Sequence, residues 1–144
     1  MLVQSYPEAT VGGLIVNDKD EILLVKSYKW GNKFTVPGGH IELGESSEAA
    51  VRREVMEEVG LEVEPVKILL VQEAIYPADY IKHEHYIFLD YLCRTKSFAV
   101  KLDEKEIQKY LWVNPEHALQ LDLESFTRNL VVEYLSHSGS EKRD

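Results

Sequence analysis

Three glutamates lie close together in the segment RREVMEEVG, residues 52–60. On an α-helix, where each residue advances by about 100°, Glu54, Glu57 and Glu58 fall within an arc of about 100°. Such a cluster either forms a solvated face that pairs with arginines or binds hard divalent cations, which prefer oxygen ligands. The helix alone does not decide between the two, but a bound cation would relieve the repulsion among the three charges.

The longer segment GHIELGESSEAAVRREVMEEVGL, residues 39–61, places these acids between a glycine-rich loop and a glycine. It is similar to the Nudix box of the Nudix hydrolases, G-x5-E-x7-R-E-U-x-E-E-x-G-U, where U is a bulky aliphatic residue. The nine constrained positions all match, and they are Gly39, Glu45, Arg53, Glu54, Val55, Glu57, Glu58, Gly60 and Leu61. Because chance does not account for nine matches over 23 residues, the chain resembles a MutT-like Nudix hydrolase.

The resemblance implies a metal site on these residues. Glu54, Glu57 and Glu58 would be ligands of Mg²⁺ or Mn²⁺, and Gly39 would add its backbone carbonyl. The cations would neutralise developing charge on phosphoryl oxygens and lower the pKa of an attacking water. Arg53 belongs to the same catalytic set.

Other residues of the box would support this site. Arg53 and Glu45 are expected to form a buried ion pair that fixes the loop against the helix, with a role in orientation rather than chemistry. Gly60 would end the helix. Outside the box, Glu106 matches the late acid that some family members bring to the site as an extra ligand or base.

Possible substrate contacts precede or open the box. Tyr28, Trp30 and Lys33 lie in the segment before PGG, where an aromatic ring could stack on a nucleobase or simply anchor the loop. His40 follows the two glycines and could touch a phosphate or lie on the surface.

The resemblance implies hydrolysis of a pyrophosphate bond in a nucleoside diphosphate linked to another group. A (d)NTP is our first expectation. ADP-ribose or another nucleotide sugar is the alternative, because Pro77 follows Leu61 by 16 residues, near an offset at which ADP-ribose-cleaving relatives tend to carry proline. A second alternative is a non-catalytic nucleotide-binding domain, which the complete set of box acids disfavours.

Hydrophobic periodicity predicts the elements that position the site. We expect a helix from Ser46 or Ser47 to about Val59, with Gly60 at its end and an apolar face turned to the core. That face consists of Val51, Val55, Met56 and Val59. Pro37–Gly39 should be a loop. Strands are expected at 10–17, 21–26, 34–36, 61–76, 85–94 and 110–114, with further helices at 115–120 and 123–136.

This order of elements predicts an α/β fold with a mixed sheet sandwiched between helices and a loop-helix-loop box, as in the Nudix fold. The length of 144 residues fits a single domain at 1–137, followed by a polar, disordered tail at 138–144. A buried thiol is expected at Cys93, the single cysteine.

The charge distribution restricts the partners. The net charge is −9, and the segment from Glu42 to Glu64 carries eight acids and two bases, a net of −6. This opposes binding to nucleic-acid polymers but permits a small phosphate-bearing ligand whose charge a metal neutralises. No apolar run is long enough for a membrane span, and no secretory signal is evident, so we expect a cytoplasmic protein. The resemblance also implies a homodimer.

Overall fold

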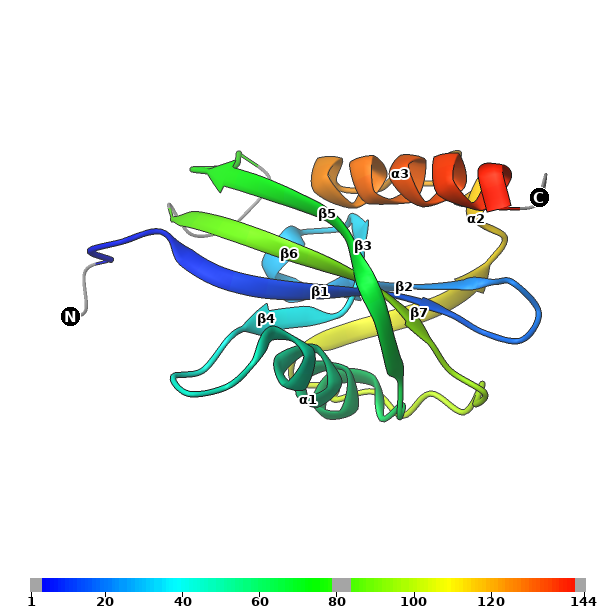
Figure 1. Ribbon diagram of the computed structural model, residues 1–144, viewed down its shortest axis with the longest axis horizontal. Coiled ribbons are helices and arrows are strands. Elements are labelled where there is room, and N and C mark those ends of the chain that lie inside the picture. The colour runs from blue at the N-terminus through cyan, green and yellow to red at the C-terminus, as the bar shows by residue number, and fades with distance from the viewer. Residues whose placement is uncertain (1–3, 79–83, 142–144) are drawn as a thin grey trace.

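The apolar runs of the sequence form one mixed β-sheet, and the computed structural model describes residues 4–78 and 84–141. The strands are β1 (Glu8–Val16), β2 (Ile22–Ser27), β3 (Phe34–Thr35), β4 (Gly38–His40), β5 (Glu64–Ile75), β6 (His85–Arg94) and β7 (Ile107–Val113). Five of them follow the order β3-β2-β1-β6-β5, while β4 pairs with β1 and β7 with β2 (Figure 1). β1 and β6 run parallel, and the other pairs are antiparallel.

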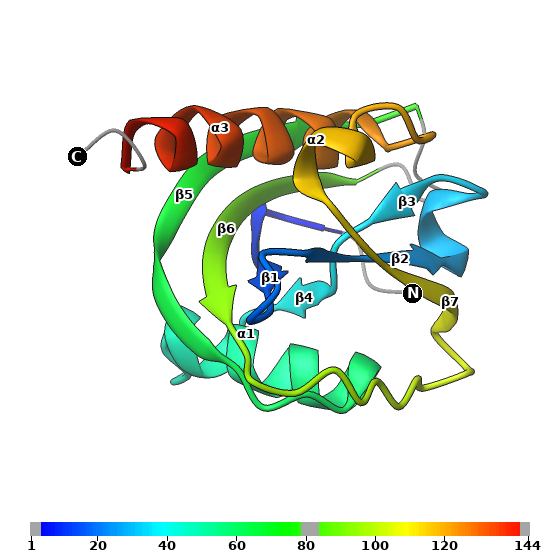
Figure 2. The ribbon, with the colours of Figure 1, turned by 90° about the vertical axis from the view of Figure 1, so that its right-hand side faces the viewer.

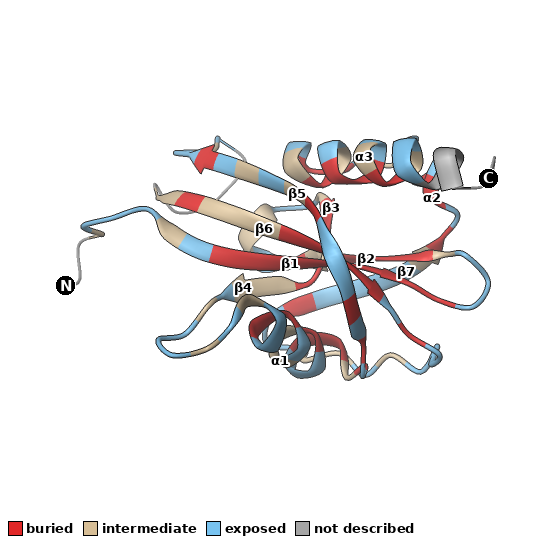
Figure 3. Cartoon of the chain, viewed as in Figure 1, coloured by how far each residue is buried: buried red, intermediate tan, exposed pale blue. Residues whose placement is uncertain are grey.

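Helices cover both faces of this sheet, which confirms the predicted sandwich. α1 (Ser47–Val59) lies on one face and α3 (Ser125–Glu141) on the other, with the short α2 (Pro115–Ala118) beside α3 (Figure 2). A 3-10 turn, η1 (Tyr28–Trp30), follows β2. Each face has its own apolar core, and residues of β1 contribute alternately to both. β1 is therefore buried on both sides at the centre of the molecule (Figure 3).

The caps of α1 lie where the sequence places them. The Ser46 hydroxyl accepts a hydrogen bond from the Ala49 amide at 3.1 Å, which satisfies one free N–H of the first turn. Gly60 adopts a left-handed conformation, with φ at 68°, and donates to the Met56 carbonyl at 3.0 Å. The apolar face was predicted one residue too wide, because Met56 is 48% exposed at the edge of its arc.

The cysteine prediction is confirmed. Cys93 is fully buried among the apolar residues between α1 and the sheet. Burial raises the pKa of its thiol to about 12, so it packs as a small apolar side chain and is unreactive at neutral pH.

The prediction that Pro37–Gly39 form only a loop is wrong. Gly38 and Gly39 belong to β4, where Gly12 faces Gly38 and Val11 faces Gly39 across an antiparallel pair. A Cβ at Gly38 would lie 2.0 Å from the Val11 carbonyl oxygen, so the two backbones approach more closely than any side chain allows. The glycines thus permit a strand here instead of breaking one.

The C-terminal boundary also differs from the prediction. α3 continues to Glu141, whereas the sequence placed the helix end at 136 and a disordered tail at 138–144. Helices extend cooperatively once formed, and His137 bonds to Glu133 one turn earlier at 2.8 Å. Residues 142–144 lie outside the described part. Among the residues that the structure describes, no helix is long and apolar enough to cross a membrane.

The close approach of β4 to β1 yields a stability prediction. Gly38→Ala should lower the free energy of unfolding by about 1–3 kcal/mol, because the added methyl group collides with backbone that cannot move alone. Thermal and urea unfolding would measure the change. Gly44→Asn is the control, because asparagine tolerates a positive φ and a Cβ there meets nothing within 4 Å. Equal stability of Gly38→Ala and the wild type would contradict the β4 pairing.

Candidate active site

Arg53 lies at the centre of the acidic cluster and contacts most of its members. Its Nε and Nη2 donate to the two carboxylate oxygens of Glu45 at 2.7 and 2.9 Å, a two-pronged pair. Its Nη1 donates to Glu54 at 2.8 Å and lies 3.3 Å from Glu57. Nη2 also donates to the His40 carbonyl at 3.0 Å. One side chain therefore ties the loop before α1 to the acids on α1.

The predicted Glu45–Arg53 ion pair is present, although it is half-buried rather than buried. The side chains are 15% and 24% exposed, respectively. The hydrogen bonds from Arg53, helped by the Glu42 backbone, lower the pKa of Glu45 to about 2. The same contact raises the pKa of Arg53 above its already high value, so both groups are charged at neutral pH.

Glu54 and Glu58 lie on the side of α1 that faces β4. A Cβ on Gly39 would lie 2.5 Å from the carboxylate of Glu54, so only glycine lets this acid rest against the strand. Glu58 is 6% exposed and accepts a hydrogen bond from the Gly38 amide at 3.2 Å. Burial, together with the nearby Glu54, raises the pKa of Glu58 well above its ordinary value. An uncompensated charge is therefore costly at this position.

Glu57 is more exposed than the other two acids. Its side chain is 57% exposed, and its carboxylate contacts Arg53. In the described part of the chain, no three histidine, cysteine, aspartate or glutamate side chains are arranged to hold one ion as they stand. Since Glu57 is exposed and held only by an i,i+4 pair, rotation of its side chain is the change that would complete an all-oxygen donor set with Glu54 and Glu58.

The segment between β6 and β7 brings a further acid close. The amides of Lys101 and Asp103 donate to the Val59 and Glu58 carbonyls, both at 2.9 Å, and so close the C-terminal end of α1. Glu106 follows on this segment, and its charge contributes to the raised pKa of Glu58. The structure therefore brings Glu106 to the acids of α1, where it also pairs with Lys29 at 3.8 Å.

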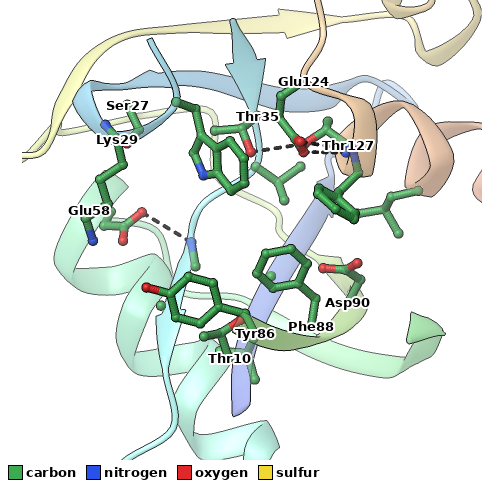
Figure 4. Close-up of a pocket in the computed structure, with 18 of the residues that line it drawn as sticks. Thr10, Ser27, Lys29, Thr35, Glu58, Tyr86, Phe88, Asp90, Glu124 and Thr127 are labelled. Carbon is green, nitrogen blue, oxygen red and sulfur yellow. Dashed lines mark hydrogen bonds between the residues drawn. The ribbon is translucent and has the colours of Figure 1, made fainter. Parts of the chain in front are cut away.

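A cleft extends from these acids across the sheet and encloses about 810 Å³ including its open mouth. Gly38, Gly39, His40 and Glu58 line one end. Three half-buried aromatic rings line the other, with centroids 6.4 Å apart for Trp30–Phe88 and Trp30–Phe126 and 5.4 Å apart for Phe88–Phe126. Figure 4 shows Glu58 on one side of the cleft and Asp90, Glu124 and Thr127 on the opposite side. The cleft combines an acidic end with an apolar, aromatic end, the mixture of side chains that is typical of small-molecule sites.

Comparison with known proteins identifies the family. The family model of the NUDIX domain matches residues 7–134, which is most of the chain. The chain belongs to the Nudix family of hydrolases. Its Nudix box is the loop, α1 and Gly60 described above, and β4 supplies the first glycine of that box.

Individual Nudix proteins are similar to this chain in sequence or in structure. The nucleoside triphosphatase NudI of Escherichia coli K12 is 36% identical over 103 residues, which cover 67% of this chain and 72% of NudI. The 8-oxo-dGDP phosphatase NUDT18 of Danio rerio is 42% identical over 66 residues, which cover 44% of this chain and only 20% of that protein. A crystal structure of a MutT Nudix hydrolase from Burkholderia pseudomallei superposes with a TM-score of 0.76 at 27% identity, over 90% of this chain and 98% of that one.

The cleft includes two of the four expected substrate contacts. Trp30 and His40 line it, whereas Tyr28, which is 52% exposed, and Lys33 do not. His40 lies 3.3 Å from Glu8 and packs against the ring of Tyr86. Lining residues that sequence reasoning missed include Thr10 of β1, Phe88 and Asp90 of β6, Glu124 just before α3, and Phe126 of α3. Asp90, a single acid within the apolar run YIFLDYLC, carried the one signal that could have been noticed.

The two-pronged contacts of Arg53 yield a first activity prediction for the Nudix box. Arg53→Lys keeps the charge but cannot hold Glu45 and Glu54 together, so turnover should fall by about 10- to 100-fold with a lower melting temperature. Arg52→Lys is the matched control, because Arg52 bonds to Glu64 on the outer side of α1. Turnover and melting curves of the two variants test this. Full turnover of Arg53→Lys would contradict the orienting role.

The lowered pKa of Glu45 yields a pH prediction. A carboxyl whose pKa is lower in the folded than in the unfolded chain adds stability above the unfolded value near 4.5 and loses it as the pH falls towards about 2. The wild type should therefore melt higher than Glu45→Gln at pH 6, and this difference should shrink below pH 4.5 and vanish near pH 2. Melting temperatures of both proteins across this range measure it. A difference that is independent of pH would contradict the ion pair.

Proposed function

We propose that this protein hydrolyses nucleoside triphosphates to a nucleoside monophosphate and pyrophosphate, with Mg²⁺ or Mn²⁺ as cofactor. The observation that carries the proposal is a cleft whose two ends differ chemically. Glu58 of the Nudix box and Glu106 line one end, and a three-ring aromatic wall lines the other. A nucleotide has the same division, with a charged phosphate chain and a flat base joined by a sugar.

The donor set at the phosphate end fits a hard divalent cation. Glu54, Glu57 and Glu58 would supply carboxylate oxygens, the backbone carbonyl of Gly39 would be a fourth ligand, and Glu106, whose charge acts on Glu58, would be an outer acid. The buried position of Glu58 supports this assignment, because burial and the nearby charges of Glu54 and Glu106 make its own negative charge costly, and a bound cation would offset that cost. When bound, the cation would neutralise phosphate charge and lower the pKa of the attacking water.

The chain's own residues would orient the reactants. Arg53 holds Glu54 in place through the 2.8 Å contact, and Glu54 would orient or deprotonate the water that attacks phosphorus. The P–O bond to the leaving pyrophosphate then breaks. Arg53 is a positioning residue in this scheme, because its five donors face Glu45, Glu54, Glu57 and the His40 carbonyl.

The substrate follows from the cleft together with the relatives. NudI is named a nucleoside triphosphatase, and its similarity to this chain, at 36% identity, extends over 67% of the chain. The aromatic end is formed by Trp30, Phe88 and Phe126, which provide stacking area for a base. We therefore rank nucleoside triphosphates above ADP-ribose and other nucleotide sugars.

A panel of nucleotides with defined metal content tests the proposal. Hydrolysis of triphosphates should require millimolar Mg²⁺ or Mn²⁺, stop in excess EDTA, and release pyrophosphate rather than orthophosphate. ADP-ribose in the same panel separates the two substrate classes. Robust turnover in EDTA, or turnover of ADP-ribose alone, would contradict the proposal.

Charge-removing variants of the acids sharpen the test. Glu57→Gln and Glu58→Gln should lower kcat at least about 100-fold, since a lost ligand removes several kcal/mol of transition-state stabilisation. Folding should persist, because neither carboxylate is needed by the apolar core. Glu62→Gln is the control for the loss of one charge just beyond the box. Full activity of either box variant would make the carboxylates structural.

A further inference from the structure

Asp90 is a buried acid that the hydrolytic end of the cleft does not use. It lies on β6, opposite Gly12 of β1, and is 6% exposed. A Cβ on Gly12 would lie 2.5 Å from its Oδ1, so the missing side chain of Gly12 leaves the space that Asp90 occupies. Burial, with a contribution from the charge of Glu124, raises the pKa of Asp90 to about 7. A buried acid facing a ligand cleft needs a role that compensates its cost.

A network on the far side fixes one of the two oxygens of Asp90. Oδ2 accepts from Gln72 Nε2 at 3.0 Å, and the same amide nitrogen donates to the Phe126 carbonyl at 2.9 Å. Asn129 donates to the oxygen of that amide at 3.0 Å, which sets its orientation. Oδ1 is therefore the oxygen of Asp90 that is left to accept a hydrogen bond from a ligand, because Asp90 itself lines the cleft.

A second group beside the aromatic end also presents acceptors. Glu124 accepts from the amides of Phe126 and Thr127 and from the Thr127 hydroxyl. That hydroxyl has one hydrogen, which it gives to Glu124, so in its 3.0 Å contact with Thr35 it must accept. Thr35 donates its hydrogen in turn and keeps only lone pairs. Thr35, Glu124 and Asp90 all line the cleft and lie on the side away from Glu58 (Figure 4).

We propose that Asp90 is a specificity-determining residue that reads the edge of the nucleobase and selects guanine. Guanine presents two adjacent donors on one edge, N1–H and the N2 amino group, to match acceptors on the wall. Adenine and cytosine present one amino group beside a ring nitrogen that accepts, and this nitrogen would face Asp90 or Thr35 without a hydrogen. A buried acceptor left opposite another acceptor loses affinity, so the wall discriminates against these bases.

The stacking rings and the acids divide the task. Trp30, Phe88 and Phe126 would stack on the faces of any base, and such stacking does not depend on which base is bound. Asp90 contacts only the edge and therefore discriminates among bases. The inference rests on the proposed function in that it assigns the aromatic end to the base of the nucleotide.

Binding of nucleoside monophosphates without metal tests the inference apart from hydrolysis. Calorimetric titrations in EDTA at pH 8, where the ionised form of Asp90 predominates, would compare GMP, IMP, AMP and CMP. We expect the wild type to bind GMP about 10- to 100-fold more tightly than AMP or CMP, with IMP between them because it lacks the N2 amino group. Asp90→Asn keeps the shape and the contact with Gln72 but replaces an acceptor-only group with an amide. This variant should lose most of the preference for GMP and retain its AMP affinity.

Asp122→Asn is the matched control, because it removes the same charge from an exposed residue that does not line the cleft. Its GMP preference should equal that of the wild type, and melting curves check that each variant folds. Equal affinity of the wild type for GMP and AMP would overturn the inference, as would an equal loss of both in Asp90→Asn. If Asp90→Asn does not fold, the affinities of the wild type for GMP, IMP, AMP and CMP alone test the inference. GMP-selective binding without hydrolysis of any triphosphate would overturn only the proposed function, and hydrolysis of all triphosphates without base preference would overturn only this inference.

Discussion

Mutual repulsion of carboxylates is the constraint on which the rest of the site depends. Glu54, Glu57 and Glu58 share one side of α1, and Arg53 is the basic side chain that contacts the first two of them. Glu58 is left in a buried position with a raised pKa. The helix tolerates this arrangement because its other side packs valines into the core and its two ends are capped. What remains unbalanced is a concentration of negative charge that matches a divalent cation carrying phosphate groups.

Close backbone packing makes this concentration possible. Gly39 must lack a side chain for Glu54 to lie against β4, and Gly38 must lack one for β4 to reach β1. The parallel pairing of β1 with β6 then places Gly12 opposite Asp90 at the other end of the cleft. The carboxylates at one end of the cleft and the acidic, aromatic wall at the other thus depend on the same central strand, β1 (Figure 1).

The sequence predicted what is local and missed what only pairing creates. α1, its serine cap and its glycine end were predictable because helical periodicity and capping act within a few residues. The Glu45–Arg53 pair followed from the fixed spacing of the box. β4 was missed, because two glycines indicate a turn unless the strand that pairs with them is known, and the partner of Gly38 is Gly12, 26 residues earlier. At the aromatic end of the cleft only Trp30 was predicted, because Phe88 and Phe126 come from β6 and α3, which the fold brings to η1.

Metal binding without nucleotide is the most direct test of the central claim that the carboxylates of α1 form a cation site. Titration of the protein with Mn²⁺, with free Mn²⁺ counted by electron paramagnetic resonance, measures that binding apart from any substrate or turnover. The account predicts that the wild type binds Mn²⁺ and that Glu58→Gln, which still folds, binds it at least about tenfold more weakly. Equal Mn²⁺ affinity of the two proteins would contradict the account, because the buried carboxylate of Glu58 would then have no cation to balance it.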